Sequence, residues 1–418
     1  MSFVNLREES QNQGGFYVPR FEVKIEGVDL PSSVLRDVVQ CTYKDNINEI
    51  DSFELTINNW DPDLNDFKYV GAETNETLED SGSESHRHRL FEPCNKEVQI
   101  DMGYGGELQR MLTGTFTTME PSFSSGGAST LNVRGLNVLH QLRHRQYNTS
   151  WRNKKASQIA EEISGLRGPA PGRERRFPLR IETNENAKGQ EPIIPYIAQR
   201  NQYDLDFLLE RARERGYVLT VCENREEQER SLYFGPSQKA PCRRDATFVL
   251  HWGKSLIDFK PTLTTANQVK SVTVRGWNRR TGRRISETAS LDEPVRLHNR
   301  RRQPQCTALN RDLHRLLVGK CDPREEVTVD EAFYTPTQAQ ERACAILQER
   351  QKEMIKASGT TVGLPDLRAG HRVYIEGIGA RFTGTYFVTE TTHTISDNGY
   401  ITRFRARRED DGSGGSSE

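Results

Sequence analysis

A chain of 418 residues is long for a single hydrophobic core, so its length predicts about two to four domains. The formal net charge of −1 argues against a dedicated nucleic-acid binder, and we expect no nucleic-acid partner. The sequence contains neither an apolar run of about 18 residues that could span a membrane nor the apolar h-region of a signal peptide.

Residues 1–19 are polar and predict an N-terminal arm, after which the pattern changes to short strands. Strands are expected over 21–25, 53–57, 98–102, 112–119 and 131–133. In the first three, apolar and polar residues alternate, which buries one face of a strand and leaves the other in water. Short strands between turn residues predict a small antiparallel barrel or sandwich over 20–150. A polar loop over 62–95 interrupts it, and we expect this loop to be mobile or ordered by a partner.

The period of the apolar residues becomes helical after Trp151. A short helix is marked by Ala156, Ile159, Ala160 and Ile163 and ends at Gly165. The next segment, 166–191, is rich in proline, glycine and arginine and predicts a loop.

A second helix is marked more clearly. The apolar face is formed by Leu205, Leu208, Leu209 and Ala212. Asp204 occupies the expected N-cap, and Gly216 the position just beyond the helix. Strands over 217–222 and 231–234, joined by a polar turn, predict a hairpin. We therefore expect a helix packed on a hairpin, within a mixed α/β domain over 151–260.

The segment 261–407 predicts a second β-rich domain. Strands are expected over 269–275, 372–375, 384–392 and 400–405, whereas 279–325 is arginine-rich and irregular. The Asp397-Asn398-Gly399 sequence predicts a tight turn between the last two strands.

One long helix is expected over 336–357 within this second β-rich domain. Thr335 suits its N-cap, Pro336 its first position and Gln338 a capping box. Its apolar face is formed by Ala339, Ala343, Ile346 and Leu347, and Gly359 would end it. Residues 408–418 predict a disordered tail.

Three segments, in this order, resemble the phage late control protein D family, the hub proteins of contractile tails and of VgrG-type spikes. The first carries Gln199, Asn201, Asp204, Phe207, Leu208, Ala212 and Gly216. The second is the Val-x-Val-x-Gly-Trp pattern within 268–277, followed by Asn278 and Thr281. The third carries Gly363, Pro365, Ala369, Gly370, Gly384, Tyr386, Val388, His393, Gly399, Tyr400, Thr402 and Phe404. The resemblance spans roughly residues 20–407.

This resemblance implies an α+β, mostly β fold, with two antiparallel β-barrel-like tube domains flanking a mixed α/β insert. It also implies a structural baseplate hub rather than an enzyme. Three copies would form a ring joining a hexameric inner tube above to a trimeric central spike below. The particle would be a phage tail, a tailocin or a contractile injection system, assembled in the cytoplasm. VgrG-type chains continue into an OB-like domain and a β-helical needle, so we expect a separate spike protein, besides other baseplate proteins.

The low apolar share of the chain, 34%, also favours long polar loops and extensive contact with other subunits. The seven cysteines are irregularly spaced in a chain that we expect to lack a leader, which predicts reduced thiols.

Several polar residues are candidates for a chemical site. His86 and His88 invite a metal site, but their spacing favours a solvated loop. His393 lies in a predicted strand and is expected to have a packing role or a hydrogen-bonding role toward the backbone. An arginine cluster favours a solvated loop or a salt-bridging interface over a phosphate site, and it comprises Arg296, Arg300, Arg301, Arg302, Arg311 and Arg315.

The acidic residues of the predicted helices are expected to be solvated rather than catalytic. They are Glu161, Glu162, Glu210 and Glu214, and a general acid/base pair would need a cleft and a raised pKa. We expect no catalytic, cofactor or metal site, and the partner-binding residues are not identified by the sequence. The alternative functions are a cell-wall (peptidoglycan) hydrolase or a wall-binding component of the tail tip.

Overall fold

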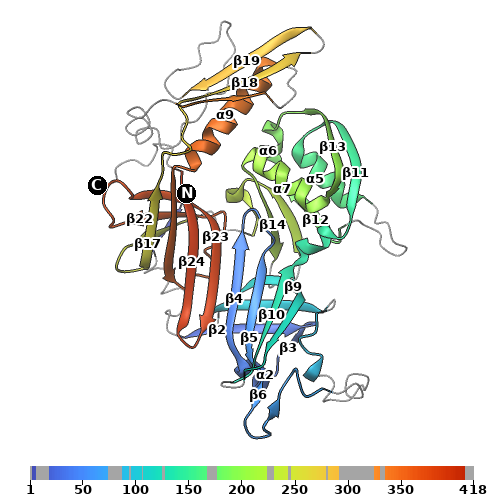
Figure 1. Ribbon diagram of the computed structural model, residues 1–418, viewed down its shortest axis with the longest axis vertical. Helices are drawn as coiled ribbons and strands as arrows, with labels where there is room; N and C mark the ends of the chain where they lie inside the picture. The colour runs from blue at the N-terminus through green and yellow to red at the C-terminus, as the bar shows by residue number, and fades with distance from the viewer. Residues whose placement is uncertain are drawn as a thin grey trace. The chain divides into compact units, whose positions relative to one another are not determined.

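The computed structural model describes residues 2–5, 18–73, 87–93, 96–105, 107–124, 128–166, 177–223, 230–242, 246–278, 281–290, 324–329 and 335–409. Strands predominate over helices in these ranges (Figure 1). The mostly β class predicted from the sequence is therefore confirmed.

Contacts between residues divide the chain into two compact units. Unit 1 comprises Met1–Phe248, Thr360–His371 and Thr389–Phe404. Unit 2 comprises Val249–Gly359, Arg372–Val388 and Arg405–Glu418. The divisions between them fall inside strands β16, β21, β23 and β24. The domain boundaries predicted from the sequence stay a prediction.

A long antiparallel sheet forms the first half of unit 1. Its strands, in spatial order, are β23 (Gly384–Ser396, through residues 389–396), β4 (Val38–Asn46), β5 (Ser52–Asn58), β10 (Thr130–Asn137), β9 (Glu107–Ser122), β8 (Glu97–Tyr104), β2 (Pro19–Ile25) and β3 (Val28–Asp29). The five strands predicted in this region are all present. Helix α2 (Ser32–Asp37) precedes β4, and neither of these two elements was predicted from the sequence.

Alternation of side chains explains why these strands pair in one register. Phe53, Leu55 and Ile57 of β5 are buried, and Ile57 and Leu55 lie opposite Leu131 and Val133 of β10. Phe53 lies opposite Gly135, where an added Cβ would come 2.2 Å from the Phe53 ring. The glycine thus makes room for an aromatic ring in the core.

The predicted polar loop over 62–95 requires a correction. Tyr69 and Phe91 are each only 1% exposed and belong to the core of this sheet, with ring centroids 5.3 Å apart. Strand β6 (Trp60–Asp61) also pairs with β7 (Asp66–Phe67) at the start of the loop. Two buried aromatic side chains therefore anchor a segment whose composition is mostly polar. Within the predicted N-terminal arm, Ser2–Asn5 form strand β1.

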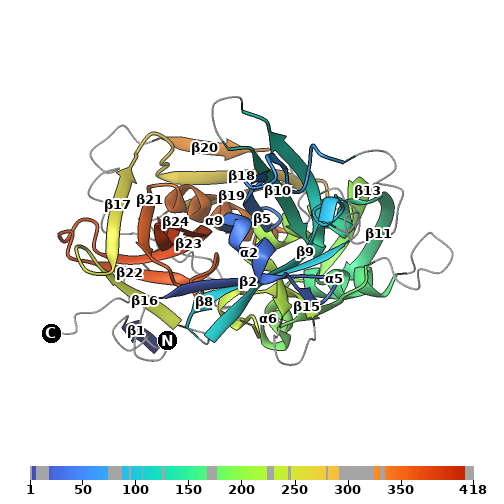
Figure 2. The ribbon, with the colours of Figure 1, turned by 90° about the horizontal axis from the view of Figure 1, so that it is seen from below.

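The second half of unit 1 is a mixed α/β region. Its elements are η1 (Val138–Arg143), β11 (Gln146–Lys154), α5 (Ala156–Gly165), β12 (Arg180–Thr183), α6 (Glu185–Gln190), β13 (Ile194–Tyr203), α7 (Asp204–Arg215), β14 (Val218–Glu223), β15 (Arg230–Gly235) and η2 (Ser237–Lys239). Strands β11 and β13 form a ribbon, and β12, β15 and β14 form a sheet. Helices α5 and α7 share one hydrophobic core with both. Figure 2 shows α5 next to β11 and β15, which it contacts.

Both predicted helices and the predicted hairpin of this region are confirmed. Gly216 follows α7 with a φ of +66°, as its predicted position requires. Asp204 is the first residue of α7 rather than its N-cap, which is Tyr203. The predicted loop over 166–191 is wrong for its second half, because β12 and α6 lie there.

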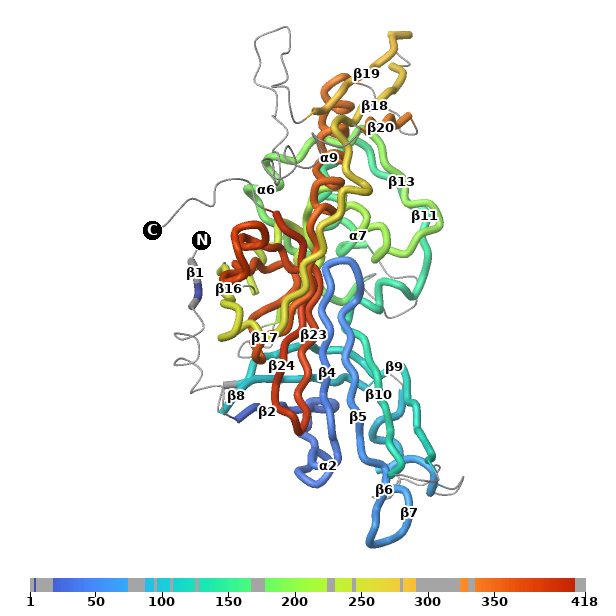
Figure 3. Tube along the Cα trace, turned by 60° about the vertical axis from the view of Figure 1, so that its left-hand side comes forward, coloured from blue at the N-terminus to red at the C-terminus, as the bar shows by residue number. Residues whose placement is uncertain are grey.

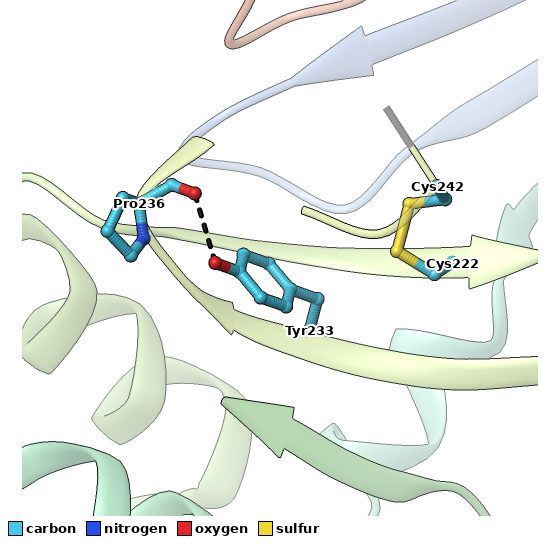
Figure 4. Close-up of a disulfide and its surroundings, with 4 residues drawn as sticks. All are labelled: Cys222, Tyr233, Pro236 and Cys242. Carbon is cyan, nitrogen blue, oxygen red and sulfur yellow. Dashed lines mark hydrogen bonds between the residues drawn. A yellow bond between two sulfur atoms is a disulfide. The ribbon is translucent and has the colours of Figure 1, made fainter. Parts of the chain in front are cut away.

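The structure also corrects the prediction of reduced thiols. Cys222 on β14 and Cys242, beyond η2, form a disulfide with their Cα atoms 5.1 Å apart (Figure 4). Beside it, the hydroxyl of Tyr233 donates to the carbonyl of Pro236 at 3.1 Å, which holds the turn after β15. Cys344 is disulfide-bonded as well, whereas Cys41 is a free, buried thiol. The spacing of the cysteines did not predict the Cys222–Cys242 disulfide, because these two residues come together only when the β14–β15 hairpin folds.

Unit 2 contains two β layers and one long helix (Figure 3). The first layer has the spatial order β16 (Ala246–His251), β22 (Arg372–Glu376), β23, β24 (Gly399–Arg408), β21 (Ile355–Val362) and β17 (Leu256–Leu263). The second has the order β19 (Arg283–Ser290), β18 (Ser271–Asn278) and β20 (Glu325–Thr328), and helix α9 (Pro336–Lys352) packs on it.

The start of α9 is confirmed, since the Thr335 hydroxyl accepts the Gln338 amide at 3.2 Å. Its predicted end is wrong. The helix stops at Lys352, and Ile355, Ala357 and Gly359 are alternate buried residues of β21. The stretch 279–325 is not irregular throughout, because β19 and the start of β20 lie in it. The turn at 397–399 is confirmed, with Gly399 at a φ of +101°.

Candidate functional site

The closing motif of the sequence forms a buried polar cluster in unit 1. His393 is fully buried, and its Nδ1 lies 3.0 Å from the Tyr400 hydroxyl and 3.1 Å from the Thr402 hydroxyl. Its Nε2 lies 3.0 Å from the carbonyl oxygen of Leu367, so Nε2 carries the proton and donates. Burial, with the nearby Arg368 charge, holds the pKa of His393 well below its usual range. The predicted packing and backbone-bonding role is confirmed.

Arg368 is the cation at the centre of this cluster. Its guanidinium lies 4.7 Å above the Tyr43 ring and donates to the carbonyls of Pro365 at 2.8 Å and Arg110 at 3.2 Å. The adjoining amide of Ala369 donates to Asp45 at 3.0 Å. These bonds fasten residues 365–369 to strands that lie hundreds of residues earlier in the sequence.

Gly363 shows the same fastening through close approach. Its carbonyl accepts the Tyr104 hydroxyl at 3.0 Å, and an added Cβ would lie 2.1 Å from the Tyr400 ring. Because His393, Tyr400 and Thr402 are all buried, no solute can reach the cluster without opening the core. The motif therefore organises the fold and is not a reaction centre.

The Gln199-to-Gly216 motif has a comparable architectural role. The Gln199 amide donates to the carboxylate of Asp204 at 2.8 Å, and both residues are buried. Phe207, one helical turn on, stacks with Trp151 at a centroid distance of 5.2 Å. The motif thus locks the ribbon β11–β13 onto helix α7.

The four acidic residues considered as catalysts all make ion pairs on helices. Lys188 contacts Glu161 at 2.8 Å, and Lys154 contacts Glu162. Arg211 contacts both Glu210 and Glu214 at 2.8 Å. Each of the four carboxylates is partly exposed.

Glu223 is a half-buried carboxylate that the sequence did not single out. It accepts the backbone amide of Thr113 at 3.1 Å and also the Thr113 hydroxyl, joining β14 to β9. Burial raises the pKa of Glu223, against the opposing influence of Thr113, Arg110 and Arg230.

The remaining candidates give no chemical site within the described residues. His88 bonds the carbonyl of Tyr69 at 2.9 Å, while His86 lies outside the described residues. The arginine cluster also lies outside them, namely Arg296, Arg300, Arg301, Arg302, Arg311 and Arg315. Where the chain is described, no group of three or more histidine, cysteine or acidic side chains could hold a metal ion. No helix among those residues is long and apolar enough to cross a membrane.

Two surfaces expose large apolar side chains beside charged side chains, and the packing of the core does not account for this exposure. The first, which we call the acidic hairpin, is Trp60–Phe67. Its aromatic base is a row of Trp60, Phe67 and Phe123, with centroid distances of 5.4 and 5.1 Å. Its tip residue Leu64 is 73% exposed, and Phe123 is 56% exposed.

The shape of the acidic hairpin is set by its own polar groups. The Asp61 carboxylate accepts the backbone amides of Asp63 and Leu64, at 3.0 and 3.3 Å. Among the described residues, Asp61, Asp63 and Asp66 make no ion pair. In the sequence, this surface is marked by an aromatic residue at each end of a run rich in aspartate. The prediction of a polar loop over 62–95 rested on polarity alone and did not use these aromatic residues.

The second surface, which we call the basic face, is formed by Arg275, Trp277 and Arg284, which the register of β18 and β19 places on one face of the sheet. Trp277 is 58% exposed and lies opposite Arg284 in the antiparallel register. The apolar residues of the same strands face α9 instead. Arg275 and Arg284 make no ion pair within the described part of the chain.

The sequence of the chain matches one family model and no curated protein. The model of a family described as the Alg8 N-terminal domain matches residues 17–397. No curated protein sequence matches the chain significantly.

Solved structures share the fold over almost the entire chain. A 43 kDa tail protein of prophage MuSo2 from Shewanella oneidensis has 14% identity and a TM-score of 0.63, covering 93% of this chain and 98% of its own. A tail protein from Neisseria meningitidis MC58 has 12% identity and a TM-score of 0.58, covering 94% and 97%. An E. coli component of the type VI secretion system, with structural similarity to the T4 tail proteins gp27 and gp5, has 14% identity and a TM-score of 0.53, covering 95% and 79%. None of these is described as a late control protein D, so that finer assignment stays a prediction.

Proposed function

The chain belongs to the Alg8 N-terminal domain family by its sequence, and from its tail-protein fold alone we propose that it is a structural baseplate hub. In this role three copies form a ring between a hexameric inner tube and a trimeric central spike. The chain transmits position and symmetry, while the energy of injection comes from other components. The particle is a phage tail or a phage-like injection system assembled in the cytoplasm.

One observation carries this proposal. The alignment with the Shewanella tail protein covers nearly all of both chains, 93% and 98%, so the likeness is that of a whole protein rather than of one common domain. A fold can serve many functions, but the E. coli relative of this architecture is itself a component of a secretion machine.

The symmetry part of the proposal rests on two β regions. Unit 1 contains the sheet from residues 389–396 of β23 to β3, and unit 2 contains β17, β22 and parts of β16, β21, β23 and β24. We propose that each builds a barrel-like tube domain, so that three copies present six similar edges to the tube. The partners are then two further copies, the inner tube protein, a spike protein and other baseplate proteins.

The buried clusters suit a part that bears load without chemistry. Arg368 and His393 fasten distant segments through bonds to backbone carbonyls, and the motif residues around them are closed to solvent. No described feature favours the alternative of a cell-wall hydrolase or wall-binding component, because Glu161, Glu162, Glu210 and Glu214 are paired with lysine or arginine.

Electron cryo-microscopy of the assembled particle tests the proposal. We expect three copies around the axis, with two β regions of similar fold alternating in one ring beneath the tube. A single copy on the axis, six copies, or two β regions of unrelated fold would contradict the adaptor role.

A further inference from the structure

The acidic hairpin and the basic face have complementary charge and similar apolar content. The hairpin exposes Leu64 beside Asp63 and Asp66, and the basic face exposes Trp277 beside Arg275 and Arg284. Asp61, Asp63 and Asp66 in one surface, and Arg275 and Arg284 in the other, make no ion pair within the described residues. Exposed charges of one sign beside exposed apolar groups are typical of an interface that a partner completes.

The two surfaces are also built to keep their shape. The aromatic row Trp60, Phe67 and Phe123 supports the hairpin from below, and Asp61 fixes its turn. Behind the basic face, Val272, Val274 and Ile285 pack on α9. Surfaces that are ordered before contact lose little conformational entropy on binding.

From this complementarity we propose that the acidic hairpin of one copy docks on the basic face of a second copy. The hairpin belongs to unit 1 and the basic face to unit 2, so the contact joins two different patches. Contacts of this head-to-tail kind close into rings when the rotation between copies allows it. The inference rests on the proposed ring of copies and names the surfaces that meet within it.

The geometry assigns separate roles to the residues of the contact. Leu64, at the tip, is the apolar group that would cover Trp277 and leave water. Asp63 and Asp66 would lie against Arg275 and Arg284, where carboxylate and guanidinium form charge-assisted hydrogen bonds. Among the described residues of this layer, Glu325 is the one acidic group whose register position is on the same face as Arg275 and Trp277, since Glu287 and Glu326 are in register with the α9-facing residues Val274 and Val272. Glu325 lies at the far end of β18 from Trp277.

A charge-swap experiment on the full chain tests the contact. Association of purified protein is measured by sedimentation velocity over a range of concentrations and salt. The variant D63K/D66K and the variant R275E/R284E should each weaken association about ten-fold or more. The combined variant D63K/D66K/R275E/R284E should restore it, because the charges again oppose one another. The control is a matched pair of variants, D258K/D397K and R152E/R180E, which make the same two changes of net charge at exposed positions elsewhere and should leave association unchanged.

Each outcome decides the matter. Loss in both double variants with recovery in the combined variant supports the contact. Equal association in all variants overturns it, as does loss without recovery while the circular dichroism of each variant remains native. Weakening by the control as well would show a general charge effect and also overturn it.

A second measurement covers a chain that remains monomeric in dilute solution. A photo-crosslinking residue replaces Leu64, and the concentrated full chain is irradiated and analysed by mass spectrometry. A crosslink to residues 271–290 of another copy supports the contact. No intermolecular crosslink, or one to another region, overturns it. In the particle image, three copies whose hairpins contact another surface would remove this inference and leave the hub role intact. A single copy would remove the hub role, whereas the crosslink would still report on the contact between copies.

Discussion

His393 shows how a buried polar residue makes the stability of this protein depend on pH. Its Nε2–H donates to Leu367, and its Nδ1 accepts from Tyr400 and Thr402, so only the neutral ring satisfies all its neighbours. The folded-state pKa lies below the unfolded value of about 6.5, because protonation is opposed by burial and by Arg368. This contribution is therefore complete above pH ~6.5 and is lost as the pH falls below it.

We predict that unfolding free energy falls by up to about 1.4 kcal/mol per pH unit below pH ~6.5 through this residue. His393→Gln should lower stability at pH 7.5 by about 1–3 kcal/mol, since it disturbs buried hydrogen bonds. The same variant should show a shallower loss between pH 6.5 and 5. Urea unfolding at several pH values measures both effects, and an unchanged slope would contradict the assignment.

Glu223 titrates in the opposite sense. Burial raises its folded pKa, so its contribution to stability is present at low pH and is lost as the pH rises through the folded pKa. Glu223→Gln keeps a carbonyl to accept the Thr113 amide and removes the charge. We predict that this variant gains stability relative to the native chain between pH 4 and 7.5. Thermal unfolding across that range measures the difference, and Glu223→Ala, which should destabilise at every pH, is the control.

At the scale of elements, the pairing of β5 with β10 depends on one glycine. A Cβ at residue 135 would lie 2.2 Å from the Phe53 ring and 2.4 Å from the backbone oxygen of Thr115. We predict that Gly135→Ala costs about 2–3 kcal/mol, because neither strand can move without breaking its ladder. Gly189→Ala, in α6 with no atom within 4 Å of the added Cβ, is the matched control. It should be neutral or slightly stabilising, and equal losses in the two variants would show that packing at Gly135 is not the cause.

The elements that the sequence revealed are those with a clear period and a clear end. Helix α7 has four apolar residues on one face and Gly216 beyond it, and all of these were found. The end of α9 was missed because Ile355 and Ala357 suit a helix as well as a strand, and only β21 pairing decides between them. The ribbon β11–β13 has polar residues on its outer face and Asn201 at a φ of +48°, so no regular alternation marks it.

The two surfaces proposed to form the contact were harder to predict from the sequence than the helices and strands were. Phe123 is far in sequence from Trp60 and Phe67, and only folding brings the three rings into one row. The spacing of Asp61, Asp63 and Asp66 is typical of a solvated loop, and only the structure shows that they make no ion pair within the described residues. Similarly, the closing motif gave its residues but not their role, because Arg368 and His393 acquire their partners from strands remote in sequence.

At the scale of the whole molecule, a hub should be chemically inert when separated from its machine. Glu161 and Glu162 are adjacent acidic residues and the candidates for the acid pair of a hydrolase. Each of them, however, makes an ion pair with a lysine at the surface of a helix. A glycosidase needs one carboxyl that stays protonated near neutral pH, which burial without a cation would favour. We predict that the purified full chain releases no soluble fragments from peptidoglycan, with lysozyme as the positive control. The variant E161Q/E162Q should match the native chain in this assay and lose about 1 kcal/mol or less of stability, as expected for partly exposed ion pairs. Fragment release by the native chain that disappears in the variant would show that the ion pairs open to form a catalytic site, and the structural role would then have to be replaced by that of a wall hydrolase.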